Sequence, residues 1–130
     1  MIIVGICGAS GSGKSTLAKR IQDSLACSCT IIGQDCYYRN FPDLPFSERI
    51  KLNYDEPAIF DFDELLHDIE LLESGQPITT KGYDYVNYLR ADKPEVLIAP
   101  PEVLVLEGIH MFYDKRLCEK MSLKVYLHVD

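Results

Sequence analysis

Basic residues are scarce in this sequence. Its 13 lysines and arginines face 20 aspartates and glutamates, so the net charge is −7 and the pI is near 4.9. Nucleic acids and anionic membranes both attract a basic surface, and the charge balance therefore argues against either as the main partner. A local anion site is not excluded, because it depends on a few placed groups and not on the total charge.

Hydrophobic runs long enough to cross a membrane are also missing, and the N-terminus lacks the basic flank of a signal peptide. The five cysteines form an odd set without a CxxC pair, which suits a reducing cytosol better than a disulfide framework. Cys27 and Cys29 stand close together, but no histidine or second cysteine cluster accompanies them, so we expect no metal site there. These features predict a cytoplasmic protein whose main partner is neither a nucleic acid nor a membrane.

Repeats, low-complexity tracts and linkers are absent, and 130 residues of 47% hydrophobic composition predict one domain over residues 1–130. Short apolar runs predict strands, and apolar residues at helical spacing predict helices. We expect strands at 2–7, 30–33, 103–106 and 123–129, and helices from residue 14 and at 61–74 and 114–121. This alternation predicts an α/β fold in which a parallel sheet with flanking helices binds ligands at the carboxyl ends of its strands.

Other segments are less regular. The first helix carries its apolar residues at Leu17, Ala18, Ile21 and Leu25. Residues 34–53 are polar, aromatic and proline-containing, which predicts a loop with at most one short helix. Residues 77–89 alternate loosely and are rich in tyrosine, so they form either a hairpin over a ligand site or an exposed ribbon.

A phosphate-binding motif lies between the first strand and the first helix. Residues 8–15 read GASGSGKS and fit the pattern G-x-x-x-x-G-K-[ST] in the strand–loop–helix setting that this pattern requires. Glycines let successive backbone N–H groups turn toward phosphate oxygens, and the helix N-terminus adds partial positive charge. A flexible turn that binds nothing is the alternative, but the setting favours binding of ATP with magnesium.

Within this motif, Lys14 is expected to reach the β- and γ-phosphates, and the Ser15 hydroxyl is expected to ligate magnesium. The full set of residues expected at the nucleotide is Gly8, Ala9, Ser10, Gly11, Ser12, Gly13, Lys14, Ser15 and Thr16.

Two acidic residues follow other predicted strands. Glu107 comes directly after the apolar run 103–106, so its carboxylate is expected at the same sheet edge as the glycine loop. There it would bind the magnesium ion, directly or through a water. The alternative is an ordinary charged strand end. Asp35 follows the second strand and is placed to orient an attacking hydroxyl. Asp35 and Lys14 are therefore the two candidate catalytic residues. Local pattern alone leaves Asp35 equally open to a role in a turn.

Several motifs occur together in a fixed order: GASGSGKST at 8–16, QDCYYR at 34–39, NYDEP at 53–57 followed by FD at 60–61, YDY at 83–85 and EGI at 107–109. In this order they resemble the uridine–cytidine kinase family, and the resemblance covers essentially the whole chain. The later motifs are more diagnostic than the phosphate loop, which many unrelated proteins share.

The resemblance implies a P-loop nucleoside-triphosphate-hydrolase-like three-layer fold that transfers the γ-phosphate of ATP to the 5′-hydroxyl of a pyrimidine nucleoside in nucleotide salvage. It implies that Asp35 is the base and that Asp55 holds the ribose hydroxyls. The residues that it places around ribose and base are Tyr38, Tyr54, Tyr83 and Tyr85. Aromatic faces suit a flat pyrimidine, whereas without the resemblance these tyrosines would indicate only the surface packing of a ribbon. The oligomeric state stays open, a homo-oligomer included.

The sequence departs from the family pattern in two respects. Tyr88 stands where the family usually has a histidine facing the exocyclic group of the base. Because a phenol can donate or accept, the choice between cytidine and uridine stays open. The family also continues past the last predicted strand into an arginine-bearing lid and further elements. We therefore expect an N-terminal fragment, truncated before the lid, that is a poor catalyst by itself.

Three other functions remain to be weighed. Phosphoribulokinase-like, nicotinamide-riboside-kinase-like and pantothenate-kinase-like enzymes share the phosphate loop and the placement of the base, but residues 53–61 favour a nucleoside. A GTPase-like switch would need an Asn/Thr-Lys-x-Asp element, and the run TKGYD at 80–84 has one residue too many. A homologue that binds ATP without transferring phosphate is the third alternative.

Overall fold

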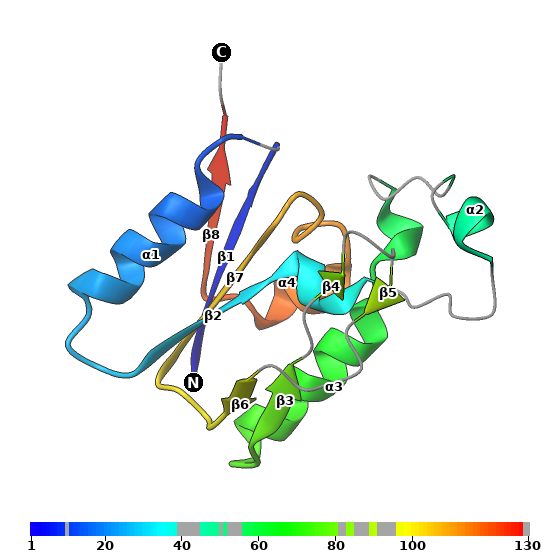
Figure 1. Ribbon diagram of the computed structural model, residues 1–130. Coiled ribbons are helices and arrows are strands. Elements are labelled where there is room, and N and C mark those ends of the chain that lie inside the picture. Colours follow the sequence, from blue (N-terminus) through cyan, green and yellow to red (C-terminus); the bar gives the residue numbers. More distant parts are fainter. Residues whose placement is uncertain are drawn as a thin grey trace.

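The computed structural model describes residues 1–9, 11–38, 45–49, 51, 56–80, 83–84, 89–90 and 96–128. A parallel sheet with strand order β2-β7-β1-β8 forms its centre (Figure 1). The strands are β1 (Ile2–Gly8), β2 (Cys29–Gly33), β7 (Val103–Gly108) and β8 (Leu123–Leu127). All three pairings in this sheet are parallel, so the four strands end at one common edge.

The two central strands of this sheet, β1 and β7, bury both of their faces. Along β1, Ile3 and Cys7 belong to one hydrophobic cluster, whereas Val4 and Ile6 belong to another. The strand β7 divides in the same way, with Leu104 and Leu106 in the first cluster and Val103 and Val105 in the second. This period of two explains why both strands appear in the sequence as continuous apolar runs.

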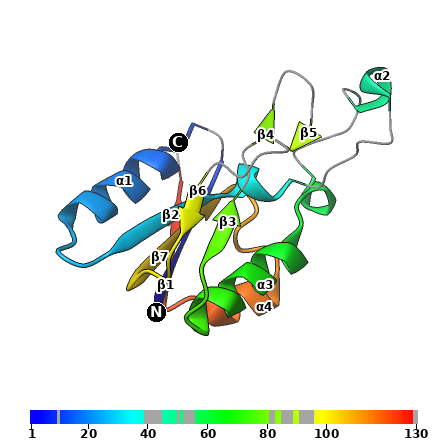
Figure 2. The same cartoon turned by 60° about the horizontal axis from the view of Figure 1, so that its bottom comes forward.

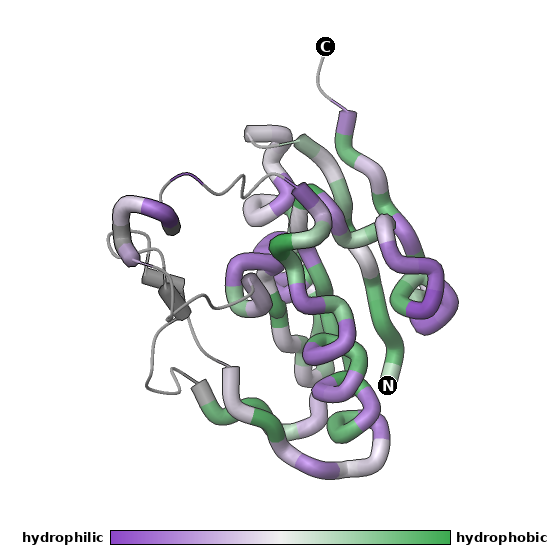
Figure 3. The backbone as a smooth tube through the Cα atoms, turned by 90° about the vertical axis from the view of Figure 1, so that its right-hand side faces the viewer, coloured by the Kyte–Doolittle hydropathy of each residue, from purple (hydrophilic) through white to green (hydrophobic). Residues whose placement is uncertain are grey.

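Helices cover the two faces and complete three layers. Helix α1 (Lys14–Ser24) packs on one face through Ala18, which is fully buried. Helices α3 (Phe62–Glu73) and α4 (Lys115–Lys120) lie on the opposite face (Figures 1 and 2). Figure 3 shows hydrophobic residues along the sheet, and hydrophobic and hydrophilic residues alternating along the helix nearest the viewer. The predicted α/β architecture is confirmed.

Helix α3 begins and ends as its sequence predicts. The Asp61 side chain caps the first turn by accepting a 3.0 Å hydrogen bond from the Glu64 N–H. At the other end Gly75 has φ +90°, and the N–H groups of Gly75 and Gln76 donate to the carbonyl oxygens of Leu72 and Leu71. These two bonds form a Schellman motif, which requires a left-handed residue that glycine adopts without strain.

Two details differ from the sequence-based expectations, and a third agrees with one of the two alternatives for residues 77–89. Leu25 is not part of α1, which ends at Ser24, and its side chain is 37% exposed instead of buried with the helix. A short strand that was not predicted, β6 (Val96–Ile98), pairs antiparallel with β3 (Ile78–Thr80). Between them, β4 (Tyr83–Asp84) pairs with β5 (Leu89–Arg90), so the tyrosine-rich segment contains a small antiparallel pair.

The segment after β2 contains short helical turns. These are the 3₁₀ helix η1 (Gln34–Tyr37), helix α2 (Phe46–Arg49) and the 3₁₀ helix η2 (Pro57–Ile59). In the part of the chain that the structure describes, no helix has both the length and the apolar character needed to cross a membrane.

Candidate active site

The glycine loop connects β1 to α1 through left-handed backbone positions. Gly11 has φ +79° and Gly13 has φ +91°, and Gly13 is the N-cap residue of α1. A Cβ atom built on either glycine would have no heavy atom of the described residues within 4 Å. The loop is therefore shaped by glycine conformation and leaves open space beside its backbone, as close approach of a phosphate requires.

Lys14 is held inside this loop. Its side chain is only 9% exposed, and its Nζ donates a 2.9 Å hydrogen bond to the Ala9 carbonyl oxygen. The same carbonyl accepts a bond from the Ser12 N–H at 3.1 Å. Because a buried ammonium needs several acceptors, a group that brings oxygen atoms to this point would satisfy it further.

A cavity of about 310 Å³ opens at the start of α1, lined by Gly11, Gly13, Lys14, Ser15 and Thr16. In the same loop, Ser12 Oγ is buried and has no hydrogen-bond partner among the described residues. A cavity with a lysine, two hydroxyl-bearing side chains and a helix N-terminus fits a polyphosphate. These residues therefore suit the nucleotide that the motif implies.

The carboxylates of Asp35 and Glu107 meet above Gly33. A Cβ atom built on Gly33 would lie 2.9 Å from Asp35 Oδ1 and 3.0 Å from Glu107 Oε1. Gly33 is the last residue of β2 and pairs with Glu107 in β7. The two acidic side chains thus share the space that a larger residue at this position would fill.

Residues of the phosphate loop also affect the pKa of Glu107. Burial raises the pKa of Glu107 above its ordinary value, and the Asp35 carboxylate raises it further, whereas the Lys14 ammonium and a hydrogen bond from Ser15 lower it. The loop, the end of β2 and the end of β7 therefore form one electrostatic unit. A cation placed between the carboxylates would relieve their mutual repulsion.

A second cavity, of about 180 Å³, joins the same groups. It is lined by Lys14, Gln34, Asp35, Tyr38, Glu107, Gly108 and Ile109. Lys14 lines both cavities, so the phosphate loop and the acidic pair open onto adjoining space. The structure thereby brings together the predicted residues Lys14, Ser15, Asp35, Tyr38 and Glu107.

The donor set of this region suits magnesium. Ser15 and Glu107 supply hard oxygen atoms, and magnesium prefers one or two such protein ligands together with waters and phosphate oxygens. Among the described residues, no group of three or more His, Cys, Asp or Glu side chains is arranged to hold a metal ion. The residues therefore fit a metal that is shared with a nucleotide.

Gln34 was not among the predicted site residues, although it precedes Asp35 in the motif QDCYYR. It is 5% exposed, it lines the cavity beside Asp35, and its Oε1 accepts a 2.7 Å hydrogen bond from the His110 N–H. The signal available in the sequence was a polar residue directly after the predicted strand 30–33 and next to Asp35. Its partner lies 76 residues away and has no sequence pattern that would identify it.

Several predicted substrate residues are not placed. Ser10 of the phosphate loop lies outside the described residues, and the same holds for Tyr54, Asp55, Tyr85 and Tyr88. Tyr83 is described only as the first residue of β4. The assignment of these residues to ribose or base stays a prediction.

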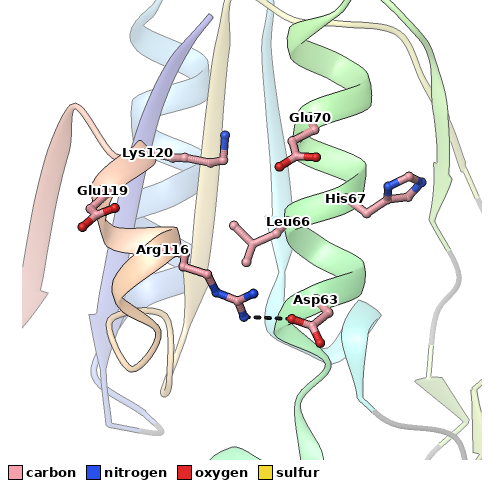
Figure 4. A pocket seen from close by; sticks show the side chains of 7 residues that line it. All are labelled: Asp63, Leu66, His67, Glu70, Arg116, Glu119 and Lys120. Atoms are coloured by element: carbon pink, nitrogen blue, oxygen red, sulfur yellow. Dashed lines mark hydrogen bonds and ion pairs between the residues drawn. The ribbon is translucent and has the colours of Figure 1, made fainter.

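A larger cavity, of about 560 Å³, lies between α3 and α4 (Figure 4). Its lining includes two cationic residues, Arg116 and Lys120. There Arg116 Nη2 lies 2.8 Å from Asp63 Oδ1 and 2.8 Å from Asp114 Oδ2. Lys120 Nζ lies 2.8 Å from Glu73 Oε1. Since carboxylates of the chain already hold both cations, this groove is a poorer phosphate site than the glycine loop.

Solved structures share this fold. A candidate fructose transport system kinase from Silicibacter sp. TM1040 matches with a TM-score of 0.82 at 20% identity, over 99% of this chain and 66% of that chain. A possible uridine kinase from Bacillus stearothermophilus matches with a TM-score of 0.73 at 20% identity, over 99% of this chain and 71% of that chain. At this identity the likeness shows the fold alone, and it confirms the expected three-layer fold of a parallel sheet with flanking helices.

Sequence relatives go further. The uridine kinase of Listeria innocua serovar 6a is 43% identical over 130 residues, which cover 99% of this chain and 62% of the relative. The uridine kinase of Limosilactobacillus reuteri is 41% identical, over 99% of this chain and 59% of the relative. The chain thus spans about three fifths of the length of these curated relatives. Because the sequence model of the Phosphoribulokinase / Uridine kinase family matches residues 3–130, the chain belongs to that family.

Proposed function

We propose that this chain is the nucleotide-binding and catalytic part of a kinase that transfers the γ-phosphate of ATP to the 5′-hydroxyl of a pyrimidine nucleoside, uridine or cytidine. Magnesium would be the required ion, and pyrimidine salvage in the cytoplasm would be the setting. The observation that carries the proposal is the meeting of Lys14, Asp35 and Glu107 at the carboxyl ends of three neighbouring strands.

Each group has a chemical role in this proposal. Lys14 binds the phosphates as a point charge and draws electron density from the transferring group. Ser15 and Glu107 hold magnesium, which when bound neutralises charge on the phosphate oxygens. Asp35 accepts the proton of the attacking hydroxyl, and its position in the same cavity as Lys14 gives it access to that hydroxyl.

The acceptor side is supported by the relatives and by one described residue. Tyr38 lines the cavity that contains Asp35, which supports a contact with an acceptor bound there. Proteins named uridine kinase are 41% to 43% identical to this chain. We assign Asp55 to the ribose hydroxyls, and Tyr54, Tyr83, Tyr85 and Tyr88 to the surroundings of the nucleoside, as part of the same proposal.

Calorimetric titration with MgATP tests the nucleotide half. The change Lys14→Ala is expected to weaken binding by about tenfold to a hundredfold, because it removes a buried charge-assisted hydrogen bond to phosphate. The matched control is Lys19→Ala, since Lys19 lies on the same helix but is 65% exposed and contacts Asp23 and Gln22 at the surface. Equal affinity in the Lys14 variant and the wild type would overturn the proposal.

A panel of acceptors with labelled ATP tests the other half. We expect label to appear on uridine or cytidine, at the 5′ position. Label on a sugar phosphate, a nicotinamide riboside or pantothenate alone would keep the kinase and replace the substrate. Tight binding of MgATP without transfer to any acceptor would indicate a nucleotide-binding homologue instead.

A further inference from the structure

The side chain of Gln34 connects the ends of two strands. Its Oε1 accepts a 2.7 Å hydrogen bond from the backbone N–H of His110, in the turn that follows β7. Since a backbone N–H can only donate, the atom that it meets must be the amide oxygen of Gln34. The side chain is 5% exposed, so water competes poorly for this bond.

Gly108 makes room for this contact. A Cβ atom at Gly108 would lie 2.4 Å from the Cβ of Gln34 and 2.5 Å from its Oε1, so a side chain at this position would force Gln34 or the backbone to shift. The Gln34 side chain therefore lies directly over the backbone of β7 at its last residue. Close packing and the hydrogen bond act on the same side chain.

This connection begins where the sheet ends. The backbone pairing of β2 with β7 runs to Gly33 and Glu107, and Gln34 is the next residue along β2. Beyond that pair the two strands separate, because β2 continues into η1 and β7 ends at Gly108 and enters the turn that contains His110. The Gln34 to His110 bond continues the cross-link between them by one further step.

Gln34 also lies in the same cavity as the two acidic groups of the site. Asp35 is its neighbour in sequence, Glu107 precedes the Gly108 that it covers, and all four residues line the same cavity. The Asp35 and Glu107 carboxylates both crowd the space above Gly33, so a small change in the separation of the two strand ends changes their spacing. A tether between those ends sets that spacing.

We propose that Gln34 is a positioning residue that fixes the spacing of the Asp35 and Glu107 carboxylates and thereby the preference of the site for nucleotide with bound magnesium. The inference rests on the proposed function of this site. Gln34 acts through the two carboxylates and needs no contact with substrate. Outer partners of metal-binding groups commonly change metal affinity by about tenfold to a hundredfold when they are replaced.

The test compares Gln34→Met with Gln22→Met. Methionine keeps the length of glutamine and removes the amide. Gln22 is a matched control because its Nε2 donates a 2.8 Å hydrogen bond to the Cys29 carbonyl oxygen, at the opposite end of β2. ATP affinity is measured by calorimetry once with excess magnesium and once with a chelator. The preference for magnesium is the ratio of the two dissociation constants.

We expect Gln34→Met to lower this ratio by about tenfold or more while the affinity for magnesium-free ATP stays within about twofold. Gln22→Met is expected to leave the ratio unchanged. Gln34→Asn serves as a second variant if the methionine variant does not fold, because its shorter side chain withdraws the oxygen from His110 while remaining polar. An unchanged ratio, or an equal loss with and without magnesium, would overturn the inference.

Amide hydrogen exchange in the ligand-free protein separates this inference from the proposed function. Exchange at His110 should become faster in the Gln34 variants, while exchange at Val105 in the centre of β7 should not change. Unchanged exchange at His110 would remove the tether even if ATP binds. A wild-type chain that fails to bind MgATP, with His110 protected, would instead overturn the proposed function and the role of Gln34 in it.

Discussion

The hydroxyl of Tyr37 donates a 2.7 Å hydrogen bond to Asp68 Oδ2 in the middle of α3. Tyr37 ends η1, only two residues after Asp35, and its side chain is 1% exposed. Its carbonyl oxygen accepts a second bond, of 2.7 Å, from the N–H of Asp61 at the start of α3. The segment that carries Asp35, the candidate base, is therefore held to helix α3 by two hydrogen bonds.

Replacing Tyr37 with phenylalanine tests how firmly this segment is fixed. The change leaves the ring in place and removes a buried hydrogen bond to a carboxylate, so we expect the free energy of unfolding to fall by about 1–3 kcal/mol. Urea unfolding at neutral pH measures it. The control is Tyr113→Phe, because Tyr113 is 69% exposed and its ring already stacks on Phe62. Equal stability of the Tyr37 variant and the wild type would show that the bond contributes little.

Gly108 and Gly5 provide a matched pair of buried glycines. A Cβ at Gly5 would meet the Sδ of Met121 at 2.3 Å, and a Cβ at Gly108 would meet the Cβ of Gln34 at 2.4 Å. The end of a methionine side chain can swing away, whereas a Cβ moves only with its backbone. We expect Gly108→Ala to cost about 2–3 kcal/mol and Gly5→Ala about 1 kcal/mol in urea unfolding. The reverse order would contradict this account.

The sequence predicted the layers of the fold because the strands follow simple periods. The apolar runs of β1 and β7 are buried on both faces, and the apolar stripe of α3 is bounded by Asp61 and Gly75, which cap its ends. Leu25 was misassigned because its spacing is helical although the chain turns extended at that residue. The strand β6 was missed because three residues are too few to show the alternation of apolar and polar residues that indicates a strand. Its pairing with β3 also depends on tertiary structure.

The order of strands and helices was enough to predict which residues of the site lie near one another. The carboxyl ends of parallel strands share one edge, so Lys14, Asp35 and Glu107 could be placed near one another without coordinates. The distances between these three side chains could not be predicted from the sequence. The crowding of two carboxylates over Gly33 and the bond from His110 to Gln34 both depend on how β2 and β7 are aligned.

The partly buried position of Glu107 predicts a stability cost at neutral pH. Burial and the neighbouring Asp35 raise its pKa above the ordinary value in the folded chain, although Lys14 and Ser15 oppose this. A carboxyl group whose pKa is raised by folding stabilises the fold while it is protonated, and this contribution is lost as the pH rises through the folded pKa. Glu107→Gln should therefore raise the melting temperature at pH 7.5 and not at pH 4.

Thermal unfolding in the presence of a chelator measures this effect. The control is Glu102→Gln, because Glu102 is an exposed acidic residue just before β7. We expect the Glu102 variant to show no comparable difference between the two pH values. A Glu107 variant that is less stable than the wild type at pH 7.5 would show that its contacts with Lys14 and Ser15 outweigh the cost of burial.

Asp35→Asn separates proton transfer from nucleotide binding. Asparagine keeps the size of the side chain but cannot take the proton of an attacking hydroxyl, so we expect phosphoryl transfer to fall by about a hundredfold or more. Affinity for MgATP should stay within about twofold, because Lys14, Ser15 and Glu107 remain in place. Single-turnover transfer from labelled ATP to uridine, with the protein in excess over ATP, measures the rate, and calorimetry measures the affinity.

The control for Asp35 is Asp23→Asn on α1, an exposed carboxylate that pairs with Lys19. It removes the same charge from the chain at a distance from the candidate site, so neither rate nor affinity should change. A rate that survives in Asp35→Asn would remove this residue as the base. A loss of MgATP affinity equal to the loss of rate would reassign Asp35 to magnesium, beside Glu107, because both carboxylates face the space above Gly33.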